Sequence, residues 1–242
     1  MTGLPEAAPG SPSEVVARVW DPLLRIFHWS LVALFVVAYV SGSHPAYYRV
    51  HLAAGIAILG LVVFRLLWGF IGPRPAQFAD FLRGIPAILA HVRELATGRL
   101  RPVAGHNALG GWAVLAILLL VLVEVVSGLF ASTFDYDGPL ARLIPDEWAA
   151  TMADVHLLNL NLLLAVLLVH LTGVAVTSAL GHENLVASMI HGRKRLPAGE
   201  LDPEISIARW RGPVAIFVAI VLVWLLLMLP AWLGQGPAGS GL

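Results

Sequence analysis

Two histidines in one apolar segment, His156 and His170, have the residue type and the spacing of metal ligands. Fourteen residues are close to four turns of an α-helix, so both imidazoles project from one face, about 21 Å apart along the axis. The hydrocarbon core of a bilayer is roughly 30 Å thick. One helix therefore offers a nitrogen ligand near each side of a membrane, as a protein that moves electrons across it requires.

The composition places these histidines in a membrane protein. Of the 242 residues, 58% are hydrophobic and 12% are charged, whereas soluble domains are about 45–50% apolar and about 25% charged. The net charge of zero gives no indication of nucleic acid binding. The absence of cysteine excludes thiolate metal sites, iron–sulfur ligation and covalent haem attachment. The nine histidines therefore remain as the candidate metal ligands.

Five apolar spans are predicted, over residues 26–43, 50–71, 107–132, 156–180 and 212–233. The connecting stretches 73–105 and 181–211 each hold five Lys and Arg residues, whereas 133–155 carries five acidic residues and only Arg142 as a basic residue. Because Lys and Arg mark cytoplasmic loops, we expect a multi-pass protein of the bacterial cytoplasmic (inner) membrane, with a cytoplasmic N-terminus and a periplasmic C-terminus. The predicted fold class is an all-α membrane protein.

The direction of each span assigns a depth to each histidine. His28 and His170 fall on the cytoplasmic side, and His51 and His156 on the outer side. Two bis-histidine sites follow, His28/His170 inner and His51/His156 outer. An unpartnered histidine in lipid is costly, and a pair of imidazoles without thiolate or carboxylate suits haem b iron better than zinc. For each single histidine, the alternative is a hydrogen bond between helices.

Several stretches have the pattern of a known family. They are VWDPLLRIFHW (19–29), HLAAGIAILGLVVFRLLWGFIGP (51–73), GHNALGGW (105–112), VHLLNLNLLLAVLLVHLTG (155–173) and HENLVASMIHGRKR (182–195). With these motifs the chain resembles the bacterial cytochrome b561 family, which includes the b-type cytochrome subunits of membrane-bound nickel–iron hydrogenases. The resemblance implies a four-helix transmembrane di-haem bundle, with two b haems ligated at the four paired histidines. It also implies that electrons pass between a redox partner on one side and the quinone pool.

The chain divides into three predicted parts: a disordered cytoplasmic tail (1–17), a di-haem four-helix domain (18–195), and a linker with a fifth C-terminal transmembrane helix and an outer tail (196–242). The fifth span lies beyond the family pattern. Residues 78–97 mix apolar and charged positions at helical spacing, which predicts a helix on the cytoplasmic surface, broken near Pro86. No internal repeat is evident.

Other residues near the predicted haems are candidate contacts. Arg25 and Arg65 suit haem propionates, although an arginine can also extend to the membrane interface. His106 and Asn107 are predicted to contact a propionate or a quinone; the alternative is helix capping by Asn107 and a surface histidine. Four glycines within the spans would leave room for a macrocycle: Gly55, Gly60, Gly128 and Gly173.

Two further residues have open roles. Glu124 is the only carboxylate inside a span, and it is predicted either to hydrogen-bond between helices or to have a proton-coupled role. His44 could compete with His51 as a ligand, but it lies in a short loop before Pro45.

The sequence therefore predicts a di-haem cytochrome that carries electrons between a periplasmic partner and quinone. The partner would be a cytochrome c or a hydrogenase-like redox-enzyme subunit, and the acidic segment 135–154 suits a basic cytochrome c. No catalytic residue is predicted. One alternative in the same family is a superoxide:quinone oxidoreductase. An alternative of another class is a histidine-based metal transporter or sensor, against which stand the few intramembrane carboxylates and the lack of an inverted repeat.

Overall fold

The computed structural model describes residues 14–98, 100, 103–197 and 210–232. Five of its helices are long and apolar enough to cross a membrane: α1 (Pro22–Gly42), α2 (Tyr48–Ile71), α5 (Ala108–Phe130), α6 (Asp146–Leu180) and α8 (Arg211–Trp232). Each of these helices overlaps one of the five predicted spans. The prediction of an all-α membrane protein is therefore confirmed.

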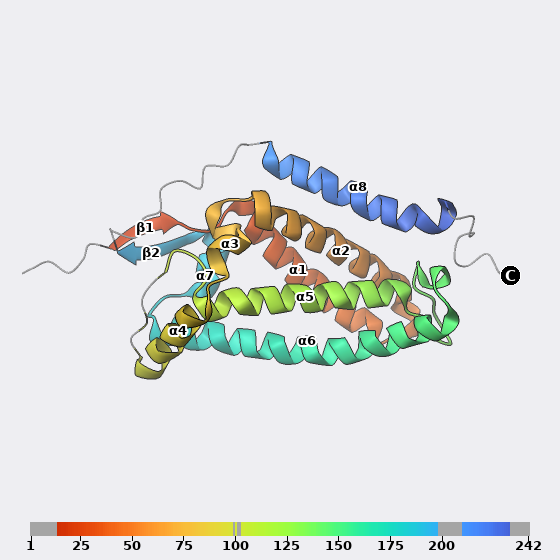
Figure 1. Cartoon of the computed structure of the whole chain (residues 1–242), viewed down its shortest axis with the longest axis horizontal. Helices are drawn as coiled ribbons and strands as arrows, with labels where there is room; N and C mark the ends of the chain where they lie inside the picture. Colours follow the sequence, from red (N-terminus) through yellow and green to blue (C-terminus); the bar gives the residue numbers. More distant parts are fainter. Residues whose placement is uncertain (1–13, 99, 101–102, 198–209, 233–242) are drawn as a thin grey trace, which may run out of the picture.

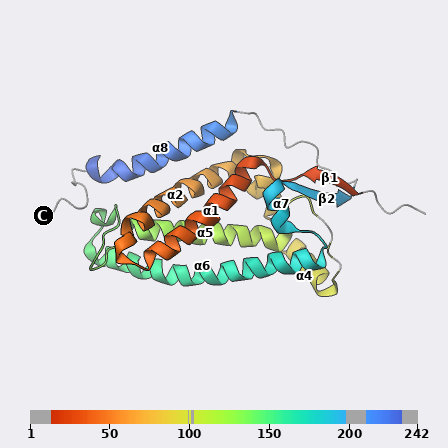
Figure 2. The ribbon, with the colours of Figure 1, turned by 180° about the vertical axis from the view of Figure 1, so that it is seen from behind.

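Helices α1, α2, α5 and α6 lie along one another as a bundle, and α8 packs along the outside of α2 (Figure 1). The view from behind shows α1 crossing in front of α2 and α5 (Figure 2). Successive helices alternate in direction, so the bundle has two distinct ends. We call them the sheet end, where α1, α5 and α8 begin, and the loop end, where α2 and α6 begin. At the sheet end, the Arg211 guanidinium donates to the Ile71 carbonyl.

Short elements cover both ends of the bundle. The sheet end carries β1 (Glu14–Arg18), η2 (Arg74–Ala76), α3 (Phe78–Phe81), α4 (Ile85–Thr97), α7 (Leu185–His191) and β2 (Arg193–Pro197). The loop end carries η1 (Pro45–Tyr47) and η3 (Ala141–Leu143). Strands β1 and β2 pair antiparallel, in a sheet that was not among the predicted elements.

The boundaries differ from the predicted ones in two places. Residues 14–17, placed in the disordered tail, belong to β1, while 1–13 lie outside the described residues. The fourth span begins at Asp146 rather than at residue 156. Asp146 and Glu147 occupy its first turn, where negative charge is favoured by the helix dipole. The predicted break between residues 78 and 97 is present, between α3 and α4, and Pro86 lies in the first turn of α4.

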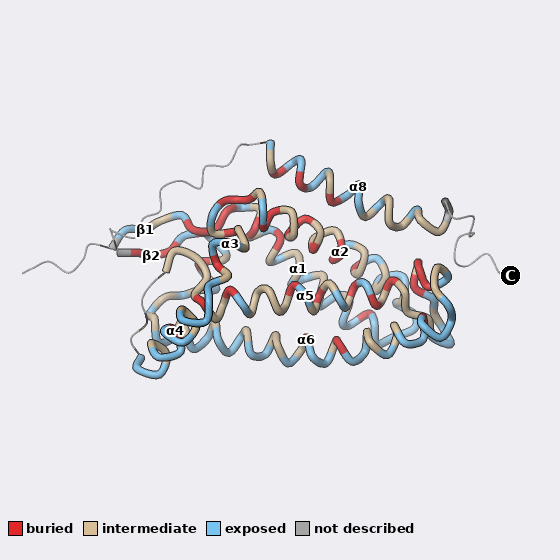
Figure 3. The backbone as a smooth tube through the Cα atoms, viewed as in Figure 1, coloured by how far each residue is buried: buried red, intermediate tan, exposed pale blue. Residues whose placement is uncertain are grey.

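The buried side chains form two clusters. The first, at the sheet end, contains Trp20, Phe27, Phe64 and Trp68. The second follows α2 and α5 toward the loop end and includes Ile58, Val121 and Leu163. Figure 3 shows that burial is concentrated where the helices face one another, and that α6 is mostly exposed. Since α6 is long and apolar, its outward face is the one that lipid would cover.

Candidate functional site

The structure brings His51 and His156 together at the loop end. Their ring centroids, one from α2 and one from α6, lie 6.0 Å apart, and the ring planes are nearly perpendicular at 88°. A metal–imidazole bond is about 2 Å long, so two imidazoles on opposite sides of one metal ion have centroids roughly 6 Å apart. The spacing of this pair is therefore that of two axial ligands.

Hydrogen bonds fix which nitrogen of each ring is available. The Nδ1 atom of His51 lies 2.9 Å from the carbonyl oxygen of Ala38, and that of His156 lies 2.8 Å from the carbonyl oxygen of Glu124. A carbonyl oxygen only accepts, so Nδ1 carries the proton in both rings. Nε2 then keeps its lone pair, which is the usual state of a metal-ligating histidine.

A polar contact between α5 and α6 adjoins this pair. The Asn159 side-chain amide donates to Glu124 Oε2 at 2.6 Å and also to the Leu120 carbonyl. The other carboxylate oxygen of Glu124 lies 3.4 Å from His156 Nε2. The predicted interhelical hydrogen bond of Glu124 is therefore present, and the carboxylate lies beside a candidate ligand.

The other two histidines lie on α1 and α6, toward the sheet end. Helix α6 is unbroken from Asp146 to Leu180, so His170 lies four turns beyond His156, as the sequence predicted. His28 is close enough to His170 for the two side chains to interact electrostatically. Among the described residues, His28 Nδ1 is buried without a hydrogen-bond partner. This nitrogen therefore has no carbonyl contact of the kind that orients His51 and His156.

Arg65 is fully buried in the sheet-end half of the bundle, with 1% of its surface exposed. Its guanidinium lies 5.0 Å from the ring centroid of Phe78 and 5.7 Å from that of Phe81. Neither Nη1 nor Nη2 has a hydrogen-bond partner among the described residues. The alternative that Arg65 extends to the interface is therefore wrong, because the aromatic side chains of α3 cover it. A buried guanidinium with free donors suits a carboxylate ligand.

His106 is packed close to Arg65. Its ring lies edge-on to Trp20 at 4.8 Å and tilted against Phe81 at 4.9 Å, and its buried Nδ1 has no partner among the described residues. Burial and, to a smaller extent, the charges of Arg65 and Lys194 together lower the pKa of His106 to about 3. The side chain is therefore neutral at physiological pH, and it is not the surface histidine of the alternative reading.

Arg25 and Asn107 have structural partners. The Arg25 guanidinium donates to the Ile190 carbonyl and so holds α7 against α1, while its Nε atom is buried without a partner among the described residues. The Asn107 side chain accepts from the backbone N–H of Gly110 at 2.6 Å and caps α5. The predicted capping role of Asn107 is therefore present.

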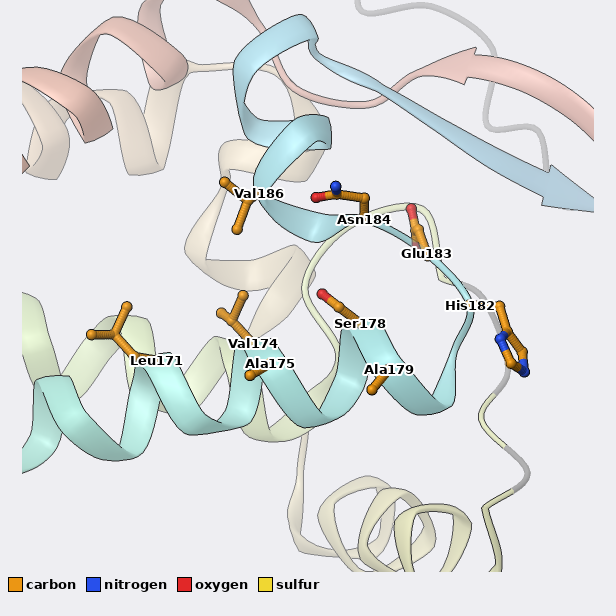
Figure 4. A pocket seen from close by; sticks show the side chains of 9 residues that line it. All are labelled: Leu171, Val174, Ala175, Ser178, Ala179, His182, Glu183, Asn184 and Val186. Carbon is orange, nitrogen blue, oxygen red and sulfur yellow. The ribbon is translucent and has the colours of Figure 1, made fainter.

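A pocket of about 540 Å³ lies between the end of α6 and α7. Figure 4 shows Val174 and Ser178 pointing from α6 toward Val186 on α7. Val174 and Ser178 follow His170 by four and eight residues, so they share its helical face. On this face the pocket therefore begins about one helical turn beyond His170, in the direction of the sheet end.

Other histidines lie apart from these pairs. His44 is exposed in the loop before η1, where its ring contacts Tyr47. Across the described residues, no group of three or more His, Cys, Asp or Glu side chains is placed to hold a metal ion. A two-imidazole site fits haem iron, whose equatorial ligands come from the macrocycle, better than a protein-only metal site.

The residues present fit such a group. Two imidazoles at the loop end have the spacing of axial ligands and keep Nε2 unprotonated. About one helical turn after His51 and His170, a Cβ built at Gly55 or Gly173 would meet no atom within 4 Å, so there is open space at both glycines. The buried, unpartnered donors of Arg65 suit propionate groups.

Fold and side chains thus define a helical membrane protein with paired imidazoles. The chain matches the family described as prokaryotic cytochrome b561 over residues 19–192 and belongs to that family. Membership implies that the protein binds haem b and has a role in transmembrane electron transfer. It also implies that the protein lies in a lipid membrane and exchanges electrons with redox partners. No curated protein and no solved structure matches the chain.

Proposed function

We propose that this protein is a di-haem cytochrome that carries electrons across the cytoplasmic membrane, between a periplasmic redox partner and the quinone pool. The observation that carries the proposal is the His51–His156 pair, with ring centroids 6.0 Å apart and both Nδ1 atoms held by backbone carbonyls. His28 and His170 form the second site, four turns away along α6. The haem, when bound, supplies reversible one-electron chemistry.

The distribution of charge supports an orientation with the sheet end in the cytoplasm. The basic β2 segment, Arg193–Pro197, lies at that end, whereas the acidic stretch 133–155 lies at the loop end. Because positive residues are retained on the cytoplasmic side, the loop end faces the periplasm in this proposal. The acidic stretch would then receive a basic partner such as a cytochrome c, and this binding should weaken as salt increases.

We place the quinone at the sheet end, near Arg25, His106 and Asn107. A neutral His106 can donate a hydrogen bond to a quinone oxygen or accept one from a quinol hydroxyl, because its pKa of about 3 keeps it uncharged. Replacing His106 by leucine should slow quinone-linked oxidation of the haems while leaving haem content unchanged. An unchanged rate would remove His106 from the quinone site.

Electron transfer across a sealed bilayer tests the proposal. The full chain is reconstituted in vesicles that contain ferricyanide, and a membrane-impermeant reductant is added outside. We expect ferricyanide reduction with the wild type, loss of it with His51→Leu and with His170→Leu, and no change with His44→Leu, the exposed loop control. Transfer at the wild-type rate in either site variant would contradict the proposal, because each haem is a necessary step.

A further inference from the structure

Two matching Ser-Gly pairs lie beneath the loop-end imidazoles. Ser41–Gly42 ends α1, and Ser127–Gly128 lies near the end of α5. In the sequence both pairs follow valine, as Val40-Ser41-Gly42 and Val126-Ser127-Gly128. Each pair belongs to the helix that packs most extensively against the helix carrying the histidine: α1 against α2, and α5 against α6.

The same three contacts occur at both places, beginning with the carbonyl. The carbonyl that accepts from His51 Nδ1 is that of Ala38, four residues before Gly42. The carbonyl that accepts from His156 Nδ1 is that of Glu124, four residues before Gly128. In a helix, the carbonyl of residue i points toward residue i+4, so a side chain at i+4 shields its second lone pair. Glycine at that position leaves the carbonyl open to the imidazole.

The glycines are also in close contact with the rings. A Cβ at Gly42 would lie 2.8 Å from Nδ1 of His51, and a Cβ at Gly128 would lie 2.9 Å from Cε1 of His156. Real Cβ atoms do not approach so closely, so any other residue would displace the ring. Gly128, which we expected to leave room for a macrocycle, instead leaves room for the imidazole.

The serines complete the arrangement. Ser41 Oγ donates to the Val37 carbonyl at 2.6 Å and lies 3.3 Å from the Ala38 oxygen. Ser127 Oγ lies 2.7 Å from the Val123 carbonyl oxygen and 3.0 Å from that of Glu124. Both serines are buried. Each hydroxyl therefore touches the carbonyl that orients the neighbouring imidazole.

We infer that Ser41–Gly42 and Ser127–Gly128 are positioning residues that set the proton position and the ring plane of the two loop-end ligands, and thereby tune the haem that these ligands hold. The inference rests on the proposed haem site at His51 and His156. A hydrogen bond from Nδ1 to a carbonyl makes the imidazole a stronger donor to the metal and favours the oxidised form. Displacing either ring weakens that bond and should raise the reduction potential of this haem.

The test compares Gly42→Ala and Gly128→Ala with Gly60→Ala in the full-length protein. Gly60 lies on the opposite face of α2 from His51, and a Cβ there would meet nothing within 4 Å. Haem content, reduction potentials and the EPR spectrum of the oxidised protein are measured. Perpendicular imidazole planes give a low-spin ferric haem a strongly anisotropic EPR signal, which changes when a ring rotates. The loop-end haem is identified as the one missing in His51→Leu.

We expect both glycine variants, although on different helices, to alter the EPR signal and raise the potential of the same haem, with the other haem and the Gly60→Ala control unchanged. Loss of only that haem would also support the inference. Unaltered signals at full haem content, or the same change in the control, would overturn it. If a glycine variant loses all haem, Ser41→Ala and Ser127→Ala decide the question. Each serine variant should shift the reduction potential of the loop-end haem alone, and an unchanged potential in both variants would contradict the inference. A wild-type protein without the loop-end haem would instead refute the proposed function.

Discussion

Replacing Arg65 by methionine tests whether the buried guanidinium holds a carboxylate of the bound haem. Arg65 is 1% exposed, and its Nη1 and Nη2 atoms have no hydrogen-bond partner among the described residues. Methionine has a similar length and retains the contact with Phe78 and Phe81. The substitution therefore removes the charge and the donors while it preserves most of the packing.

Arg65→Met should weaken the binding of haem but stabilise the haem-free protein. Removing one partner of a buried charge pair costs about 3–5 kcal/mol, which is roughly a hundred- to several-thousand-fold in affinity. Arg65→Met should therefore release the sheet-end haem much faster than the wild type. In the haem-free protein, the same change removes a buried charge without a hydrogen-bonded partner, so thermal stability should rise. Arg65→Lys, which keeps the charge but loses the planar fork, should fall between them.

Haem transfer from the purified protein to a scavenging protein measures the first effect, and thermal unfolding of the haem-free form in detergent measures the second. Wild-type haem retention in Arg65→Met, together with an unchanged potential of the sheet-end haem, would refute the reasoning. It would mean that the free donors of Arg65 face no carboxylate.

Three further predictions follow from contacts elsewhere in the bundle. Asn159→Leu should lower the free energy of unfolding by about 1 kcal/mol, because the intramembrane hydrogen bond to Glu124 is lost. Thermal unfolding should detect this loss. Asn161→Leu serves as the unaffected control, because the Asn161 amide donates to Leu157 of its own helix and to no other helix in the described part of the chain. Burial raises the pKa of Asp21. An acid whose pKa rises on folding binds more protons in the folded state, so its contribution to stability falls as pH rises from 3.8 through the raised pKa. Asp21→Asn should therefore gain stability relative to the wild type between pH 4 and pH 7, and a stability difference that does not change with pH would count against this. His28→Leu and His170→Leu should each remove the same haem from the absorption spectrum, and loss of different haems would break the proposed pairing.

Features set by local sequence could be predicted without the structure. The five long helices follow from runs of apolar residues, because a helix that satisfies its own backbone is what a bilayer permits. The fourteen-residue spacing of His156 and His170 fixed their relative depth, since α6 is continuous. The cap at Asn107 and the interhelical hydrogen bond of Glu124 were among the alternatives that residue type alone indicated, although the partner of Glu124 was not.

Features that depend on contacts far apart in the chain could not be predicted. The β1–β2 sheet pairs Arg18 with Arg193, and neither strand has the apolar alternation of a buried strand. The burial of Arg65 depends on Phe78 and Phe81 in α3, which fold back over α2. The repeated Val-Ser-Gly was visible in the sequence, but only the structure places each copy beneath an imidazole.

The haem content of the purified, full-length protein tests the central claim most directly. Reduced-minus-oxidised absorption spectra, with the haem quantified after extraction, give the number of b haems for each chain. Paired imidazoles at both ends of the bundle predict two, each with the spectrum of a six-coordinate low-spin haem. A content near one, or the absence of haem bands, would contradict the pairing of His28 with His170 and of His51 with His156.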